Sequence, residues 1–314
     1  MNIAEFRQKY PEDTLVLPSG KPFPYRYYKN PQAKATVVLL TGGIGLSDLL
    51  YLHFDRLAKD FSVLTFDYPI CFADNKELAQ AVAALLQHLG EKAWFVGQSL
   101  GGVVAQIIAS LYPEVVDGLI LSNTCSLAKD MSPSAYAHLM NMLKSQEKFK
   151  KLLSVLPFSA VKHSIKRVVL NQKKNGLTSQ EKKTLEAFCA IMMDLLTKEY
   201  ERHMVDLLID TQNYLGMTKE TFTTWNDRVL LMLSADDATF TQDCKDALIS
   251  VMPNPTVYTN LTGGHLSLLF RLEEYALHFI HIYISSFQLV LANHVLKINR
   301  PFCRRFHCTY TFFQ

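Results

Sequence analysis

Val96-Gly97-Gln98-Ser99-Leu100-Gly101-Gly102 is the stretch of this chain that decides its fold. It follows an apolar run at residues 93–96 that predicts a buried strand, and it precedes small and apolar residues at 103–109 that predict a helix. A serine at the apex of such a tight turn has a strained backbone and leaves no space for side chains two positions to either side. Gly97 and Gly101 occupy those positions, so the pattern predicts that Ser99 is an exposed nucleophile.

Apolar runs alternate with helical patterns before residue 125 and again after residue 226. The continuous apolar runs predict strands covered on both faces, at residues 36–40, 61–66, 93–96, 116–121 and 229–233. Helices are predicted at residues 47–59, where Ser47 or Asp48 is the expected cap, and at 76–89, 103–111, 242–251 and 268–284. Residues 14–17 and 24–28 predict an antiparallel hairpin at one edge. We therefore expect an α/β fold with a mainly parallel, doubly wound sheet.

Residues 125–226 interrupt this alternation, because they contain helical patterns only. We expect helices at residues 134–144, 147–156, 160–170 and 179 to about 208. An all-helical insertion between two strands predicts a lid over the carboxyl edge of the sheet. The expected organisation is a core at residues 1–124 and 227–285, a helical cap at 125–226, and a tail of unclear origin at 286–314.

Three chemically matched groups follow predicted strands in the order serine, aspartate, histidine. They are Ser99, the pair Asp236 and Asp237, and His265. Reactive groups of an open parallel sheet gather beyond the carboxyl ends of its strands, so we expect these side chains to converge. A serine hydroxyl needs a base to take its proton, which is the role expected of His265, and a carboxylate would hold the imidazole in the required tautomer.

This order, the Gly-x-Ser-x-Gly turn, the glycine loop at residues 41–45 and the sequence Gly263-Gly264-His265 together resemble the α/β-hydrolase superfamily over about residues 14–285. The resemblance implies the α/β-hydrolase fold and a catalytic triad. By the usual spacing in that family, the acid lies three residues after Ser234, which selects Asp237. A shift of one residue at the strand end would select Asp236 instead, so both stay open.

The same resemblance implies an oxyanion hole made of two backbone N–H groups. Leu100 supplies one by its position after the nucleophile, and Gly43 supplies the other, with Ile44 as the neighbouring alternative. We assign Ile44 and Gln98 to substrate binding as well.

The expected function is hydrolysis of a small carboxylic ester or thioester through an acyl-enzyme intermediate. The resemblance leaves open the acyl group, the leaving group and the type of bond, since amide and carbon–carbon hydrolases use the same triad. A second hypothesis comes from residues 66–69, 212–214 and 262–264, which resemble the maspardin-like proteins, regarded as non-catalytic binding partners on a hydrolase fold. Those proteins lack a histidine at the place of His265, and this difference favours an enzyme.

Composition excludes several other classes. The 314 residues are 49% hydrophobic and carry a formal net charge of +3. Residues 286–314 contain four cations, more than this net charge, so the rest of the chain is close to neutral. A nucleic-acid surface is therefore not expected. The six cysteines contain no Cys-x-x-Cys pair, and no signal peptide or long apolar span is evident, which favours free thiols and a cytoplasmic location. We expect no metal and no cofactor, and the oligomeric state is open.

Overall fold

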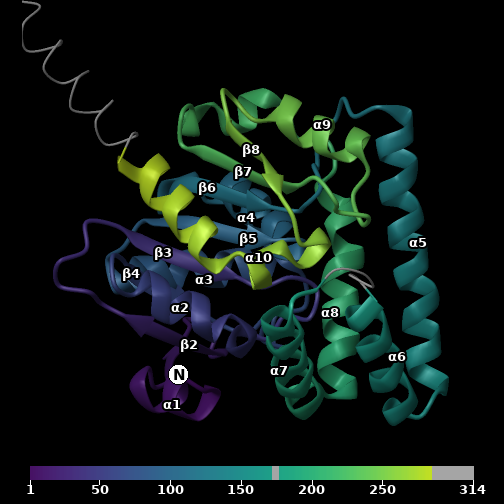
Figure 1. Ribbon diagram of the computed structural model, residues 1–314. Coiled ribbons are helices and arrows are strands. Elements are labelled where there is room, and N and C mark those ends of the chain that lie inside the picture. Colours follow the sequence, from purple (N-terminus) through teal and green to yellow (C-terminus); the bar gives the residue numbers. More distant parts are fainter. Residues whose placement is uncertain (172–176, 285–314) are drawn as a thin grey trace, which may run out of the picture.

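The computed structural model describes residues 1–171 and 177–284, and it shows an eight-stranded sheet between two layers of helices (Figure 1). The strand order is β1-β2-β4-β3-β5-β6-β7-β8. The strands are β1 Asp13–Val16, β2 Pro22–Tyr28, β3 Thr36–Leu40, β4 Ser62–Thr65, β5 Ala93–Gln98, β6 Val116–Ser122, β7 Val229–Ser234 and β8 Thr256–Leu261. β1 and β2 form the antiparallel edge, and every pair from β4 to β8 is parallel. The predicted α/β fold with a mainly parallel sheet is confirmed.

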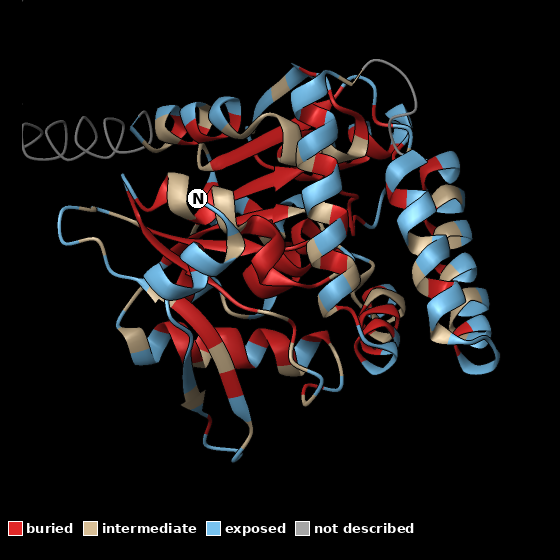
Figure 2. Cartoon of the chain, turned by 60° about the horizontal axis from the view of Figure 1, so that its bottom comes forward, coloured by how far each residue is buried: buried red, intermediate tan, exposed pale blue. Residues whose placement is uncertain are grey.

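Helices cover both faces of the sheet because its central strands are apolar on both sides. In β3, Val38 and Leu40 belong to one core, whereas Val37 and Leu39 belong to the core on the opposite face. The helices outside the insertion are α1 Ile3–Lys9, α2 Tyr51–Leu57, α3 Asn75–Leu89, α4 Leu100–Leu111, α9 Gln242–Val251, α10 Ser267–Phe270 and a last helix at 272–284. Figure 2 shows the buried strands at the centre and helices that are buried on one side only.

The turn between β5 and α4 has the strained backbone that the sequence predicts. Ser99 has a φ of 54°, in the region that favours glycine, and it precedes the first turn of α4. A Cβ atom at Gly97 would lie 2.3 Å from the Gly101 carbonyl oxygen, and one at Gly101 would lie 2.5 Å from the carbonyl oxygen of Leu40. Both glycines are therefore needed for α4 to approach the ends of β3 and β5.

In the described part of the segment between β6 and β7, four α-helices stand beside the sheet in Figure 1. They are α5 Pro133–Val155, α6 Phe158–Asn171, α7 Ser179–Leu195 and α8 Lys198–Asp210. Two predicted boundaries are wrong: the helices expected at 134–144 and 147–156 are one continuous helix, α5, and the helix expected from 179 to about 208 is broken into α7 and α8. The break occurs because the Thr197 side chain accepts a hydrogen bond from the Tyr200 N–H and starts α8 as a new helix.

Smaller differences concern the ends of helices. Neither Ser47 nor Asp48 caps a helix by its side chain, because Ser47 donates to Asp67 and Asp48 pairs with Arg7 in a short 3₁₀ turn that precedes α2. The predicted helix at 268–284 is interrupted at Arg271. The tail expected at 286–314 lies outside the described residues, as do Cys303 and Cys308.

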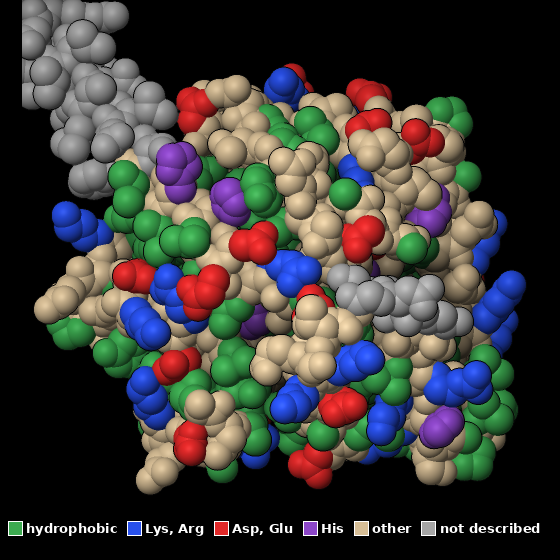
Figure 3. All heavy atoms as spheres, in the orientation of Figure 1, with side chains coloured by type: hydrophobic (Ala, Val, Ile, Leu, Met, Phe, Trp, Pro, Cys, Tyr) green, Lys and Arg blue, Asp and Glu red, His purple; other side chains and the backbone are tan. Residues whose placement is uncertain are grey.

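The surface of the described residues is mixed in charge. On the face drawn in Figure 3, lysine and arginine side chains alternate with aspartate and glutamate. Cys71, Cys125, Cys189 and Cys244 are free thiols. Among residues 1–171 and 177–284, no helix has both the length and the hydropathy that crossing a membrane would require.

Substituting Gly101→Ala is expected to destabilise the fold by about 1–3 kcal/mol, because the added methyl group overlaps the backbone at the end of β3. Urea unfolding followed by circular dichroism measures this change. Ser110→Ala, an exposed position near the end of the same helix, serves as the control and is expected to change stability little. Equal stability of the two variants would contradict the packing argument.

Candidate active site

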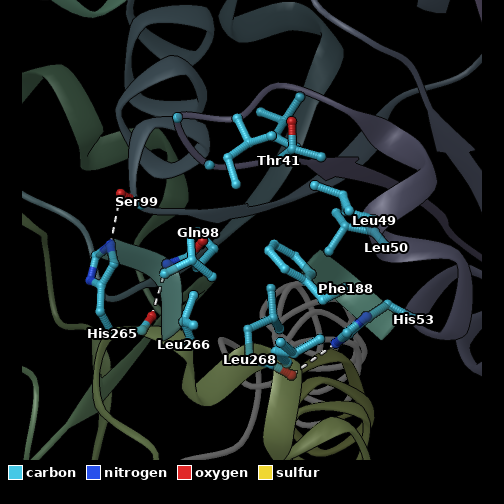
Figure 4. A pocket seen from close by; sticks show the side chains of 16 residues that line it. Thr41, Leu49, Leu50, His53, Gln98, Ser99, Phe188, His265, Leu266 and Leu268 are labelled. Carbon is cyan, nitrogen blue, oxygen red and sulfur yellow. Dashed lines mark hydrogen bonds between the residues drawn. The ribbon is translucent and has the colours of Figure 1, made fainter. Parts of the chain in front are cut away.

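Three side chains from the ends of β5, β7 and β8 form a continuous chain of contacts. The Nε2 atom of His265 lies 3.0 Å from the Oγ atom of Ser99, as Figure 4 shows, and its Nδ1 atom lies 3.1 Å from Oδ2 of Asp237. An ionised carboxylate only accepts hydrogen bonds, so the neutral imidazole carries its proton on Nδ1. Nε2 is then free to accept the proton of Ser99. The structure thus brings together three residues that lie up to 166 positions apart.

The two aspartates after β7 have different partners. Asp237 has a fully buried side chain that faces His265, and it also accepts a hydrogen bond from the Thr239 N–H. Asp236 instead accepts hydrogen bonds from the N–H groups of Gly263 and Gly264. Asp236 therefore stabilises the loop that carries the histidine, whereas Asp237 contacts the imidazole itself.

The backbone of His265 is held by two amides that were not predicted to do so. Gln98 donates to the His265 carbonyl at 3.0 Å, and Asn123 donates to the Gly264 carbonyl at 3.0 Å. Asn123 also accepts from the Ser234 N–H and has a φ of 37°. It directly follows β6, and no local pattern in the sequence indicated this role. Gln98 also lines the cavity, where we had assigned it to substrate binding.

Backbone N–H groups beside Ser99 are available for a ligand. Within the described residues, the N–H groups of Gly43, Ile44 and Leu100 have no hydrogen-bond acceptor in the protein. Gly43 and Ile44 line the cavity that contains Ser99, and Leu100 begins α4. Gly43 is exposed, Ile44 is half-buried and Leu100 is the first residue of α4, so these donors are free to bind a ligand, and such an arrangement suits a site for a developing negative charge.

Two tyrosine hydroxyls hold the glycine loop at residues 41–45 in place. Tyr68 donates to the Thr41 carbonyl at 2.8 Å, and Tyr200 of α8 donates to the Gly45 carbonyl at 2.8 Å while accepting from the Tyr68 N–H. Burial raises the pKa of both phenols, so both stay protonated donors. Sequence reasoning missed them, because a buried tyrosine in a loop, such as Tyr68, or in a helix, such as Tyr200, has the same pattern as any core residue.

A cavity of about 180 Å³ opens beside Ser99, and six of its sixteen lining residues are leucines (Figure 4). It lies between the glycine loop, the loop that carries His265, and helices α6 and α7, which contribute Val169 and Phe188. His53 is also buried here, where its Nε2 atom contacts the Leu268 carbonyl at 2.9 Å and burial lowers its pKa. Such a wall suits an apolar group better than a charged one.

Comparison with known proteins identifies the family of this chain. The model for the alpha/beta hydrolase fold matches residues 35–272. Homoserine O-acetyltransferase from Thermus thermophilus is 43% identical over 89 residues, which are 28% of this chain, and the chain spans 20% of that relative's length.

Solved structures share the fold at low sequence identity. MenH from S. aureus has a TM-score of 0.66 and 15% identity, covering 83% of this chain and 98% of its own. A structure from work on carboxylesterases of Nitrososphaera gargenis has a TM-score of 0.63 and 16% identity, covering 90% of this chain and 100% of its own.

Replacing Tyr200 by phenylalanine is expected to destabilise the protein by about 1–3 kcal/mol, because the Gly45 carbonyl and the Tyr68 N–H lose their common partner inside the protein. Tyr136→Phe removes a hydroxyl from a half-exposed ring on α5 and is the matched control. Urea titration of both variants measures the difference. If Tyr200→Phe were as stable as the control, the hydroxyl would not be holding the loop.

Proposed function

The chain belongs to the alpha/beta hydrolase fold family, and from this premise we propose that it is a serine hydrolase that cleaves a small carboxylic ester or thioester. The observation that carries the proposal is the contact chain from Ser99 through His265 to Asp237, beside a cavity and unpaired backbone N–H groups. In this proposal Ser99 is the nucleophile, His265 the general base and acid, and Asp237 the residue that orients the imidazole.

Acylation begins when Nε2 of His265 takes the proton of Ser99 and the serine oxygen attacks the carbonyl carbon of the substrate. The carbonyl oxygen becomes negatively charged and accepts hydrogen bonds from the N–H groups of Leu100 and Gly43, with Ile44 as the alternative to Gly43. When the tetrahedral intermediate collapses, the bond to the leaving group breaks. The leaving oxygen or sulfur takes the proton from His265, and an acyl-serine remains.

Deacylation repeats these steps with a new nucleophile. His265 takes a proton from water, the hydroxide attacks the acyl-serine, and collapse returns the proton to Ser99 and releases the acid. An alcohol in place of water would give acyl transfer, and the name of the homoserine O-acetyltransferase relative makes alcohols worth including as acceptors. We propose hydrolysis as the main reaction, with no cofactor.

We also propose that residues 125–226 act as a cap on a core formed by residues 1–124 and 227–285. Support comes from Val169 of α6 and Phe188 of α7, which line the cavity that also contains Ser99. The alternative function is a non-catalytic adaptor like the maspardin-like proteins. His265 and its two contacts favour the enzyme over this alternative.

A fluorophosphonate probe is expected to label the wild-type protein at Ser99, because the probe reacts with serines activated by a base. Labelling should disappear in Ser99→Ala and fall strongly in His265→Ala, measured by in-gel fluorescence and intact mass. The exposed positions Ser110→Ala and His88→Ala are controls that should label normally. Failure of well-folded wild-type protein to label would support the adaptor instead.

The two aspartates are expected to differ in turnover. Asp237→Asn should lower kcat for p-nitrophenyl esters by about 10⁴-fold, because an amide stabilises the wrong imidazole tautomer. Asp236→Asn keeps one acceptor oxygen for the N–H groups of the loop, so its kcat should fall less than about tenfold. The kcat of both variants is measured with a series of p-nitrophenyl esters of graded chain length. The reverse ranking would identify Asp236 as the acid.

A further inference from the structure

A second cavity, of about 380 Å³, adjoins the glycine loop and shares part of its lining with the leucine-rich cavity. It is walled by helices α5, α6 and α8, which lie together at the side of the sheet in Figure 1. Gly43, Ile44 and Val169 line both cavities, so the two spaces meet at the predicted oxyanion donor. A substrate bound at Ser99 can therefore extend a substituent into the second cavity.

The chemistry of the second cavity differs from that of the first. Its walls include Gln146 of α5, Ser164 of α6 and Glu201 of α8 among apolar side chains. Glu201 is 8% exposed. Within residues 1–171 and 177–284, its carboxylate has no hydrogen-bond or ion-pair partner. An isolated acid buried in this way is rare, because desolvation disfavours its charged form.

The cations on the surrounding helices do not neutralise this carboxylate. Lys150 of α5 pairs with Asp206, and Lys162 of α6 donates to the Met193 carbonyl. Burial raises the pKa of Glu201 to about 7, and no opposing charge contributes to that shift. The first turn of α8 favours acids through the helix dipole, but Glu199 shares that turn and is exposed. The helix dipole therefore does not explain why Glu201 faces a cavity.

We propose that the second cavity is a subsite for a cationic amine carried by the substrate, with the Glu201 carboxylate as its counter-ion. This inference rests on the proposed function for its catalytic part, since Ser99 would act on a bond of the same molecule. The apolar part of the substrate occupies the leucine-lined cavity, and its ammonium group pairs with Glu201. An ammonium replaces the water that the carboxylate lost on burial, which makes the charged pair more favourable than either group alone.

Binding without turnover provides the first test. Ser99→Ala protein is titrated with n-pentylammonium and with 1-pentanol, a neutral ligand of similar length, by ligand-observed NMR. Adding Glu201→Gln to this background should weaken the binding of n-pentylammonium by about ten- to a hundredfold, because a charge-assisted hydrogen bond is lost. The affinity for 1-pentanol should not change. Glu199→Gln removes the same charge from the exposed side of the first turn of α8 and should change the affinity for neither ligand.

Turnover provides the second test and locates the amine in the substrate. p-Nitrophenyl 6-aminohexanoate is compared with the heptanoate, and 5-aminopentyl acetate with hexyl acetate, so that the amine lies in the acyl part or in the alcohol part. In Glu201→Gln, kcat/KM for the ammonium member of one pair should fall about ten- to a hundredfold, with its neutral member unchanged or faster. The pair that responds identifies which side of the bond enters the second cavity.

The outcomes separate this inference from the proposed function. Hydrolysis that does not discriminate ammonium from neutral esters, or that falls equally for both in Glu201→Gln, overturns the amine subsite and leaves the hydrolase intact. Ammonium binding that depends on Glu201, with no ester hydrolysed by wild-type protein, overturns the hydrolase and leaves the subsite. Circular dichroism of Glu201→Gln confirms that the variant is folded before either comparison.

Discussion

The contact between the start of α4 and the ends of β3 and β5 is the constraint on which the site depends. Two glycines make it possible, because a Cβ atom at Gly97 or Gly101 would overlap backbone atoms. The close approach holds Ser99 at a φ of 54° and leaves its hydroxyl at the sheet edge, where the ends of β7 and β8 also arrive. A looser turn would move this hydroxyl away from the imidazole, whose Nε2 atom lies 3.0 Å from it.

The same edge of the sheet is stiffened by polar groups that do no chemistry in the proposed reaction. Asn123 and Gln98 hold the backbone that carries His265, and Asp236 holds the two glycines before it. On the opposite side, Tyr68 and Tyr200 hold the glycine loop. A buried hydrogen bond of this kind contributes about 1 kcal/mol to stability, but its larger effect is to fix the position of a loop that the sheet alone leaves free.

The strands and the convergence of Ser99 and His265 could be predicted from the sequence, because continuous apolar runs and strand-end positions are local patterns. The helical segment was harder. Its helices face both the sheet and one another, so a single amphipathic period does not show that residues 134–156 continue or that a new cap occurs at Thr197. The choice between Asp236 and Asp237 also needed coordinates, because one residue of slip at the end of β7 exchanges their directions.

The glycine loop also borders two cavities of different chemistry, and its position bears on which parts of the protein would determine substrate specificity. In the proposed reaction its N–H groups would face the carbonyl of the substrate, while Gly43 and Ile44 form the wall shared by an apolar cavity and one that contains Glu201. On this proposal the core of the fold supplies the groups that acyl transfer needs, and the inserted helices supply the walls that would distinguish one substrate from another. Because Tyr200 and Glu201 are neighbours in α8, the helix that positions the loop also presents the buried acid. A movement of α8 would alter both together, so in the reaction proposed above a shift of this helix would change substrate recognition and oxyanion stabilisation at the same time.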